Sequence, residues 1–417
     1  MSVIRVRGLQ NLHGEIRIQG SKNAVLPLMA AALLHSGIIV ITNVPRIQDV
    51  FCMLGILESL GCHCRFEGHE LMMDTRSLLL SRVPDVHGKQ MRSSVILLGP
   101  LLGRLHEAET CYPGGCSIGR RPVDLHLSAL EKMGAEVWAK EDQIRVSAKA
   151  LQGTDIYLSF PSVGATENIL MAATASSGIT RIHGAAREPE IEILCRFLNA
   201  MGAAIDGIGS DLLTIHGGKP FHDVVFAVPG DRIVAGTYLG ALMAAGGNIR
   251  LLGVPTEHMG GTLAAVRGMG CEVKAQHGDI CACMKERPRP VSLCTGPYPE
   301  FSTDLQSVML AAASVAQGRS RIRENVFEER FATAQELQKM GAHIIIKGKT
   351  ALVTGTYPLA GGVVQARDLR GGAALVVAGL AAEGESRIYG YSYISRGYED
   401  ISRDLAAVGA DLSLEED

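Results

Sequence analysis

The stretch Leu57-Glu58-Ser59-Leu60-Gly61-Cys62 indicates the fold of this 417-residue chain, because the same phrase returns five more times. Each copy has an aliphatic residue, two variable positions, an aliphatic residue or Met, then Gly, and finally Ala or Cys. Successive glycines lie 68 to 73 residues apart, a spacing too even for chance. We interpret the chain as one supersecondary unit copied six times. The other copies cover residues 130–135, 198–203, 266–271, 337–342 and 405–410.

Each copy is typical of the end of a helix followed by a strand. The glycine suits the left-handed backbone position just after a helix, and the aliphatic residues before it fit the last helical turns. Alternating residues follow it, as at 136–138 and 343–346, and predict a strand. An Ala-rich helix precedes each phrase, and its small residues predict burial on nearly all sides. These helices are predicted at residues 23–34, 92–102, 165–175, 236–245, 304–316 and 371–382.

Six repeats in a chain of this length predict two α/β domains of three repeats each. The best boundary is the segment 228–231, which has three phrases before it and three after it. Residues 3–18 are predicted to form two strands that join the second domain. We therefore expect a first domain over residues 22–229, and a second domain made of residues 1–21 and 230–417.

Composition excludes several classes of partner. A net charge of -3, from 40 basic and 43 acidic residues, gives no reason to expect nucleic acid or an anionic membrane. The sequence has no signal peptide and no apolar stretch of membrane-spanning length, so we expect a soluble cytoplasmic protein. The ten cysteines are scattered and lack C-x-x-C spacing, so we expect no metal and no cofactor.

Charged and capping residues gather where the Ala-rich helices begin. Examples are Lys22, Asp304 and Arg370, which follow the capping residues Ser21, Thr303 and Asp368 within two positions. Free N–H groups at such helix ends can bind a small anion. Each residue alone could equally be an ordinary N-cap or a solvated charge. Because repeats place these positions on corresponding faces, two three-repeat domains could bring them to one cleft.

The second repeat departs most from the others, at the Gly-rich loop 113–122. This loop carries Cys116 close to Arg120 and Arg121. Neighbouring positive charge favours the reactive thiolate, and a mobile Gly-Gly segment lets the thiol reach into a closing site. A thiol in a disordered loop is the alternative, and we favour a functional Cys116.

Five motifs carry a resemblance to a known family. The chain resembles UDP-N-acetylglucosamine enolpyruvyl transferases from residue 7 to residue 410, and the cysteine loop is the most specific match. The matching motifs are GSKNA at 20–24, PGGCSIGRRPVDLH at 113–126, SVGAT at 162–166, REPE at 187–190 and RGYE at 396–399.

The resemblance implies a fold and a reaction. The fold would be two inside-out α/β barrels built from βαβαββ-like repeats, with helices inside, sheets outside and the active site in the cleft between the domains. The reaction would transfer enolpyruvyl from phosphoenolpyruvate to the 3-hydroxyl of UDP-N-acetylglucosamine, releasing phosphate. In the family this is the first committed step of peptidoglycan synthesis, so the partners would be these two small molecules.

The resemblance also implies roles for residues. Asp304 matches the general base for the sugar hydroxyl, and Lys22 and Arg396 match catalytic cations. Cys116 matches the thiol that protonates the phosphoenolpyruvate methylene and is alkylated by fosfomycin. Residues matching phosphoenolpyruvate contacts, several of them bidentate guanidinium groups, are Lys22, Asn23, Arg92, Cys116, Arg121, Arg370 and Arg396. Residues matching UDP-N-acetylglucosamine contacts are Asn23, Arg92, Arg121, Pro122, Val123, Asp124, Leu125, Ser162, Val163, Gly164, Asp304, Val326 and Arg330.

One position departs from part of the family, and two alternatives stay open. Phe160 stands where some members carry Lys, which affects how the nucleotide binds and leaves the reaction assignment unchanged. The first alternative is enolpyruvyl-shikimate-phosphate synthase, which shares the fold but lacks the cysteine loop. The second is a non-catalytic scaffold or UDP-sugar-binding paralogue, against which the intact Lys22, Cys116 and Asp304 argue.

Overall fold

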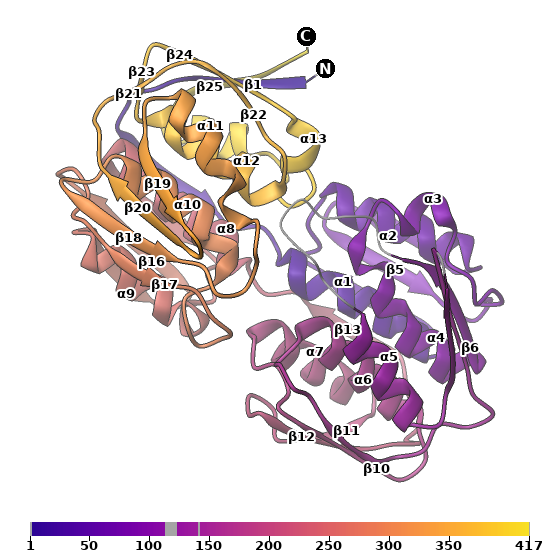
Figure 1. Cartoon of the computed structure of the whole chain (residues 1–417). Helices are drawn as coiled ribbons and strands as arrows, with labels where there is room; N and C mark the ends of the chain where they lie inside the picture. The colour runs from indigo at the N-terminus through magenta and orange to yellow at the C-terminus, as the bar shows by residue number, and fades with distance from the viewer. Residues whose placement is uncertain (1, 113–122, 141, 417) are drawn as a thin grey trace. The chain divides into compact units, whose positions relative to one another are not determined.

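The computed structural model describes residues 2–112, 123–140 and 142–416, apart from the side chain of Arg92. The chain divides into two compact units. We call the described residues between Gly20 and Val228 the first unit. Those up to Gln19, together with those from Pro229 onward, form the second unit. Figure 1 shows the helices and strands of each unit.

The six repeated glycines adopt one helix-ending geometry. Gly61 has a φ of +106°, and its N–H donates to the carbonyl of Glu58 at 3.0 Å. The next N–H, that of Cys62, donates to Leu57 at 3.0 Å. This pair of bonds is a Schellman motif, in which a residue with positive φ satisfies the last helical carbonyls. The same pair of bonds, with φ between +86° and +115°, occurs at Gly134, Gly202, Gly270, Gly341 and Gly409.

The first unit contains the first three repeats. Its helices are α1 (Lys22–Ala31), η1 (Ala32–Leu34), α2 (Gln48–Ser59), α3 (Asp85–Gly88), η2 (Arg92–Leu97), α4 (Leu98–Leu105), α5 (Asp124–Lys132), α6 (Val163–Ala175) and α7 (Pro189–Ala200). Its strands are β3 (Ile38–Thr42), β4 (His63–Glu67), β5 (Glu70–Asp74), β6 (Glu107–Cys111), β7 (Glu136–Lys140), β8 (Gln143–Ser147), β9 (Asp155–Tyr157), β10 (Ile179–His183), β11 (Ala204–Asp206), β12 (Leu212–His216) and β13 (Val224–Ala227).

The second unit contains the last three repeats and the N-terminal strands. Its helices are α8 (Arg232–Ala245), η3 (Thr256–His258), α9 (Gly260–Gly268), η4 (Thr303–Leu305), α10 (Gln306–Ser314), η5 (Arg330–Ala332), α11 (Thr333–Lys339), α12 (Leu369–Leu380), α13 (Tyr391–Ile394) and α14 (Ile401–Ala406). Its strands are β1 (Ser2–Arg7), β2 (Leu12–Arg17), β14 (Gly247–Leu252), β15 (Glu272–Gln276), β16 (Asp279–Met284), β17 (Ser292–Cys294), β18 (Arg319–Arg323), β19 (His343–Lys347), β20 (Thr350–Thr354), β21 (Leu359–Ala360), β22 (Val363–Gln365), β23 (Ala382–Glu383), β24 (Glu385–Tyr389) and β25 (Asp411–Glu416).

The repeats share one sheet topology. In β9-β10-β12-β11, the first pair is parallel and the other two pairs are antiparallel. The same pattern holds in β13-β3-β5-β4, β2-β14-β16-β15, β17-β18-β20-β19 and β22-β24-β1-β25. In the second repeat, β6-β8-β7 keeps the antiparallel part. The parallel strand shrinks there to one bridge between Arg82 and Glu109.

The N-terminal segment forms the two strands expected from the sequence. Strand β1 pairs with β24 and β25 and so completes the sheet of the sixth repeat. Strand β2 pairs in parallel with β14 and completes the sheet of the fourth repeat. Residues 2–7 and 12–17 therefore pair with strands that lie more than 230 positions later in the chain.

The Ala-rich helices are buried along nearly their whole length, as predicted. All residues from Ile233 to Ala244 of α8 are buried, and α8, α10 and α12 pack against one another. Small residues allow this close approach: a Cβ placed on Gly240 would lie 2.2 Å from Cγ1 of Val308 in α10. A side chain at this position would have to displace α10, so the glycine is required by packing.

The predicted helix over residues 92–102 is wrong in its first half. This segment begins as the 3₁₀ helix η2 and becomes α-helical only at Leu98. The side chain of Asn168 explains the change, because it takes the place of one helical bond. Its Nδ2 donates to the carbonyl of Val95 at 2.9 Å, and its Oδ1 accepts from the N–H of Gly99 at 2.7 Å. A side chain inserted into the i to i+4 ladder disrupts a helix in this way.

A membrane span requires a helix of sufficient length and apolarity. No helix of the described residues is both long enough and apolar enough to cross a bilayer.

Candidate active site

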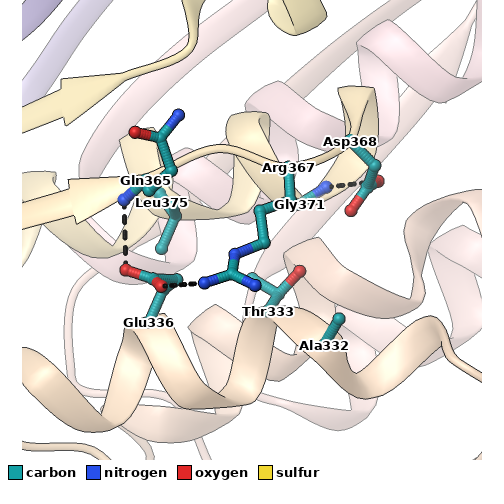
Figure 2. A pocket seen from close by; sticks show the side chains of 8 residues that line it. All are labelled: Ala332, Thr333, Glu336, Gln365, Arg367, Asp368, Gly371 and Leu375. Carbon is teal, nitrogen blue, oxygen red and sulfur yellow. Dashed lines mark hydrogen bonds and ion pairs between the residues drawn. The ribbon is translucent and has the colours of Figure 1, made fainter. Parts of the chain in front are cut away.

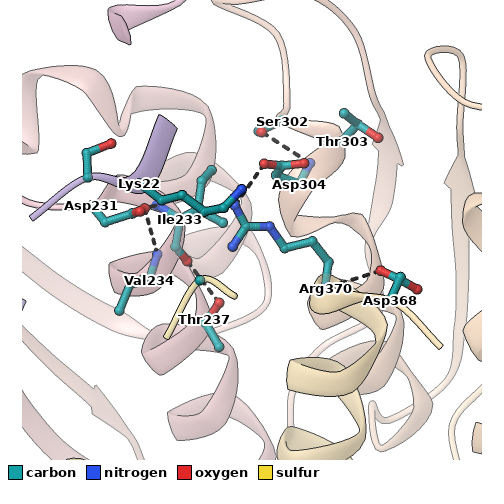
Figure 3. A network of polar contacts seen from close by, with 12 residues as sticks. Lys22, Asp231, Ile233, Val234, Thr237, Ser302, Thr303, Asp304, Asp368 and Arg370 are labelled. Atoms are coloured by element: carbon teal, nitrogen blue, oxygen red, sulfur yellow. Dashed lines mark hydrogen bonds and ion pairs between the residues drawn. The ribbon is translucent and has the colours of Figure 1, made fainter. Parts of the chain in front are cut away.

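A charged cluster in the second unit surrounds Asp304, the predicted general base. Asp304 lies in η4, immediately before α10, and Ser302 caps this turn by accepting from its N–H at 3.3 Å. Nη2 of Arg330 lies 2.7 Å from Oδ1 of Asp304. Nη2 of Arg370 lies 2.9 Å from Oδ2 (Figure 3). Both oxygens of the carboxylate are thus fixed by a guanidinium group.

Arg370 is the more unusual of the two cations. It lies in the first turn of α12 and is 4% exposed. Burial is the largest influence on its pKa and lowers it. The charges of Asp304, Tyr398 and Asp231, together with the hydrogen bond to Asp304, outweigh burial and raise the pKa of the guanidinium. Its Nη1 is buried and has no hydrogen-bond partner among the described residues. A buried cationic donor of this kind calls for an anionic or carbonyl acceptor.

Arg330 is fixed by its own surroundings. It is 3% exposed, and its Nε donates to the carbonyl of Thr303 at 3.2 Å. Arg330 therefore holds the backbone on one side of Asp304 and the carboxylate itself. Because the guanidinium of Arg330 is bonded to Thr303 and Asp304, we interpret Arg330 as a residue that holds this turn in place.

Glu324, which the sequence analysis missed, supports the same turn. It is 1% exposed, and its Oε2 accepts from the hydroxyl of Thr303 at 3.0 Å. Its Oε1 accepts from the N–H of Val326 at 2.7 Å and from that of Phe327 at 3.1 Å. The N–H of Val326 is thus already engaged, so the carbonyl is the backbone group that Val326 can offer to a nucleotide.

Lys22 lies in the first unit, at the first position of α1. Its Nζ is 3.0 Å from Oδ2 of Asp49, whose side chain is 4% exposed. The turn before it is closely packed, because a Cβ on Gly20 would lie 1.8 Å from the carbonyl oxygen of Asn43. Gly20 is therefore required where it stands, and it sets the position of Ser21 and Lys22. Asn23 follows in the same helical turn.

The predicted nucleotide contacts of the first unit lie at the beginnings of two helices. Val123 precedes α5, and Asp124 and Leu125 open that helix. Ser162 caps α6 by accepting from the N–H of Ala165, and Val163 and Gly164 open α6. Helices α5 and α6 pack against each other.

A buried pair, also missed from the sequence, joins these two helices. His126 of α5 is 6% exposed, and its Nδ1 lies 2.7 Å from Nδ2 of Asn168 in α6. The amide cannot be turned round, because its oxygen accepts from the N–H of Gly99 and its nitrogen donates to the carbonyl of Val95. Nδ1 of His126 must therefore accept, which places the ring proton on Nε2.

Two helix beginnings do not have the free N–H groups that we expected for anion binding. Asp231 caps α8 by accepting from Ile233 and Val234. Asp368 caps α12 by accepting from Arg370 and Gly371 at 3.0 Å each (Figure 3). A carboxylate already occupies these amides, so the ordinary N-cap interpretation is right for both helices.

Other predicted residues take less defined positions. Arg396 is half-buried and follows the short helix α13. Phe160 is 46% exposed and therefore does not pack into the core. Cys116, Arg121 and Pro122 lie outside the described residues, as does the side chain of Arg92. The structure brings together Asp304, Arg330 and Arg370, while the assigned roles of all these residues stay predictions.

The described cysteines are free thiols, and most are buried. Burial raises the pKa of Cys62 to about 11 and that of Cys195 to about 12. Cys111 ends strand β6 and is 1% exposed, which agrees with the structural interpretation of this residue. Buried thiols of this kind stay protonated near neutral pH and are poor nucleophiles.

A small cavity lies beside the first turn of α12, between Glu336 and Asp368 (Figure 2). Oε2 of Glu336 accepts from the N–H of Gln365 at 3.1 Å. Nη2 of Arg367 lies 3.7 Å from Oε1 of Glu336. The cavity measures about 10 Å³, which is room for about one water molecule. It is too small for a substrate.

Comparison with known proteins shows which family this chain belongs to and which solved structures share its fold. The family model described as EPSP synthase (3-phosphoshikimate 1-carboxyvinyltransferase) matches residues 6–405. Among solved structures, the enolpyruvyl transferase NikO from Streptomyces tendae superposes with a TM-score of 0.89 at 25% identity, covering 99% of this chain and 98% of that one. EPSP synthase from Acinetobacter baumannii has a TM-score of 0.76 at 17% identity over the whole of both chains. The class is thus that of the enolpyruvyl transferases.

Curated relatives narrow the class. UDP-N-acetylglucosamine 1-carboxyvinyltransferase 2 of Caldanaerobacter subterraneus is 43% identical over 99% of both chains. UDP-N-acetylglucosamine 1-carboxyvinyltransferase of Nitratidesulfovibrio vulgaris is 42% identical over the full length of both. The chain belongs to the UDP-N-acetylglucosamine 1-carboxyvinyltransferase family.

Proposed function

We propose that the protein transfers the enolpyruvyl group of phosphoenolpyruvate to the 3-hydroxyl of UDP-N-acetylglucosamine and releases phosphate. Relatives with this enzyme name are 41–43% identical over nearly the whole chain. The structural observation that supports the proposal best is Asp304, whose two carboxylate oxygens are held by Arg330 and Arg370. This arrangement fixes a base and a buried cation side by side.

The proposed mechanism is addition followed by elimination. Asp304 accepts the proton of the sugar hydroxyl while the oxygen of that hydroxyl bonds to C2 of phosphoenolpyruvate. Cys116 gives a proton to C3. The methyl group then returns a proton to the Cys116 thiolate as the bond from C2 to the phosphate oxygen breaks, and Asp304 gives its proton to the departing phosphate. The double bond returns and inorganic phosphate leaves, so atoms and charges balance without a cofactor.

Cationic residues would stabilise the charge of the substrates and the tetrahedral intermediate. Arg370 has the buried Nη1 that an oxyanion needs. We assign Lys22, Arg121 and Arg396 to the phosphate and carboxylate of phosphoenolpyruvate, in agreement with the resemblance. Asp49 holds Lys22 by an ion pair at 3.0 Å, so it orients this cation.

The nucleotide would be bound by the beginnings of α5 and α6 in the first unit, and by Asp304 and Val326 in the second. We further propose that each three-repeat domain is an inside-out barrel, with the first domain corresponding to the unit from Gly20 to Val228, close to the predicted residues 22–229. Burial of the helices and the shared sheet topology support this description. Cytoplasmic location, a part in cell-wall synthesis and inhibition by fosfomycin belong to the same proposal.

The alternative acceptor is shikimate 3-phosphate. The EPSP synthase structures are 17% identical and support the shared fold alone. The deciding experiment measures phosphate release with phosphoenolpyruvate and either acceptor. We expect release with UDP-N-acetylglucosamine only. Release with shikimate 3-phosphate and none with the UDP-sugar would refute the proposal, and release with neither would favour the non-catalytic paralogue.

A further inference from the structure

Gln19 is the last residue of the second unit before the chain enters the first unit. Its side chain bonds to a segment that begins 378 positions later in the sequence. Nε2 donates to the carbonyl of Gly397 at 3.1 Å, and Oε1 accepts from the N–H of Glu399 at 2.9 Å. One amide therefore satisfies a backbone acceptor and a backbone donor on either side of Tyr398. Only a side chain with both groups at this length can make the pair of bonds.

The segment that Gln19 binds follows Arg396 directly. Gly397 and Tyr398 are buried, and Tyr398 is 1% exposed. The hydroxyl of Tyr398 is hydrogen-bonded to that of Thr237 in α8 at 2.8 Å. The residues after Arg396 are thus anchored at three points, two of them on the amide of Gln19.

The same residue is tied to the beginning of α8. The carbonyl of Gln19 accepts from the N–H of Asp231 at 2.8 Å, and Asp231 caps α8. Thr237, the partner of Tyr398, stands in the second turn of α8. Gln19 and α8 therefore bind each other, and both bind the residues that directly follow Arg396.

We propose that Gln19 is a positioning residue for Arg396, and through it for the anionic end of phosphoenolpyruvate. The inference rests on the proposed function, since it takes Arg396 as a phosphoenolpyruvate contact. The hydrogen bonds that the structure describes for Gln19 go to Gly397, Glu399 and Asp231, beside Arg396 and at the beginning of α8. Its influence should therefore fall on one substrate. Two neutral hydrogen bonds hold the turn, and their loss lets Arg396 sample positions that do not meet the anion.

The test compares Gln19→Met with the wild type. Methionine keeps the length of the side chain and removes both hydrogen-bonding groups. We expect the KM for phosphoenolpyruvate to rise by roughly tenfold, with the KM for UDP-N-acetylglucosamine unchanged within about twofold. Gln10→Ala is the matched control, because Gln10 is an exposed glutamine of the same N-terminal segment. Gln19→Glu keeps the acceptor for Glu399 and should show a smaller defect if the added charge is screened by salt.

Hydrogen exchange gives a readout that is independent of activity. The amide of Glu399 should exchange faster in Gln19→Met than in the wild type, because its acceptor is lost. Faster exchange with a selective rise in the KM for phosphoenolpyruvate supports the inference. Unchanged KM values, or an equal rise for both substrates, would overturn it. A wild type that is inactive with both substrates present would instead refute the proposed function, so the two failures can be told apart.

Discussion

Nη2 of Arg370 lies 2.9 Å from Oδ2 of Asp304, although the two residues are 66 positions apart. The contact joins the first turn of α12 to the turn before α10 (Figure 3). Arg370 is almost fully buried, so its charge depends on this carboxylate. Asp304 therefore has two proposed functions: it orients a buried cation and it acts as a base.

Asp304→Asn tests both functions. The amide nitrogen would place N–H groups against one guanidinium, and the remaining oxygen is a much weaker base. We expect phosphate release to fall by at least about a hundredfold, with a lower melting temperature. Asp411→Asn is the control, because Asp411 is an exposed aspartate of the same unit. Wild-type turnover in Asp304→Asn would contradict the assignment of the base.

Glu324→Ala should weaken nucleotide binding. The change removes the acceptors of Thr303, Val326 and Phe327 together, so the segment beside Asp304 loses its support. We expect the KM for UDP-N-acetylglucosamine to rise by roughly tenfold or more. Glu324→Gln should lose less, since its oxygen can still accept both N–H groups. The exposed Glu328→Ala serves as the control, and an equal KM in Glu324→Ala and Glu328→Ala would sink this idea.

The sequence predicted the repeat architecture better than it predicted the residues that hold the site residues in position. The glycine phrase is a local signal, because its Schellman geometry depends only on the helix that it ends, and all six copies adopt it. Lys22, Asp304 and Arg370 could be singled out because charge at the beginning of an Ala-rich helix is conspicuous.

The residues that were missed act through tertiary contacts that leave no local pattern. Asn168 sits inside an apolar helix and replaces a bond in another helix 69 residues away. Glu324 resembles any charged residue after a strand until the fold buries it. Asp49 could have been suspected, because a carboxylate among the buried residues of α2 needs a partner.

Asn168→Leu tests the insertion of this side chain into the α4 segment. Leucine has the same branched arrangement of heavy atoms, though bulkier methyl groups, and leaves the N–H of Gly99 and the carbonyl of Val95 without their present partners. We expect the free energy of unfolding in urea to fall by about 2–5 kcal/mol. Asn199→Leu is a matched comparison, because that amide also bonds two backbone groups of Ile205 but is only half-buried. It should cost less, and an equal or larger loss at Asn199 would count against the account.

Glu167 should make stability depend on pH. Burial, followed by the charges of Glu190 and Glu188, raises the pKa of this carboxyl from 4.5 to about 8. Between these values the folded protein binds a proton that the unfolded chain releases. Stability is therefore highest below about pH 4.5 as far as Glu167 is concerned, and it falls as the pH rises to about 8, by a few kcal/mol at most, on the order of 1.4 kcal/mol per unit.

Glu167→Gln should remove this slope, because a neutral amide has no proton to lose. Urea unfolding between pH 5 and pH 8 measures the effect, and the exposed Glu131→Gln of the same unit should keep the wild-type slope. Parallel pH profiles for Glu167→Gln and the wild type would show that Glu167 does not titrate in this range.

The most direct test of the central claim is a phosphorus NMR measurement of the complete reaction. The purified protein is incubated with phosphoenolpyruvate and UDP-N-acetylglucosamine, and inorganic phosphate and the UDP-sugar product are quantified together. We predict one phosphate for each enolpyruvyl-bearing UDP-sugar, and neither product when one substrate is left out. Phosphate release without a modified UDP-sugar, or no reaction of the wild type, would contradict the account.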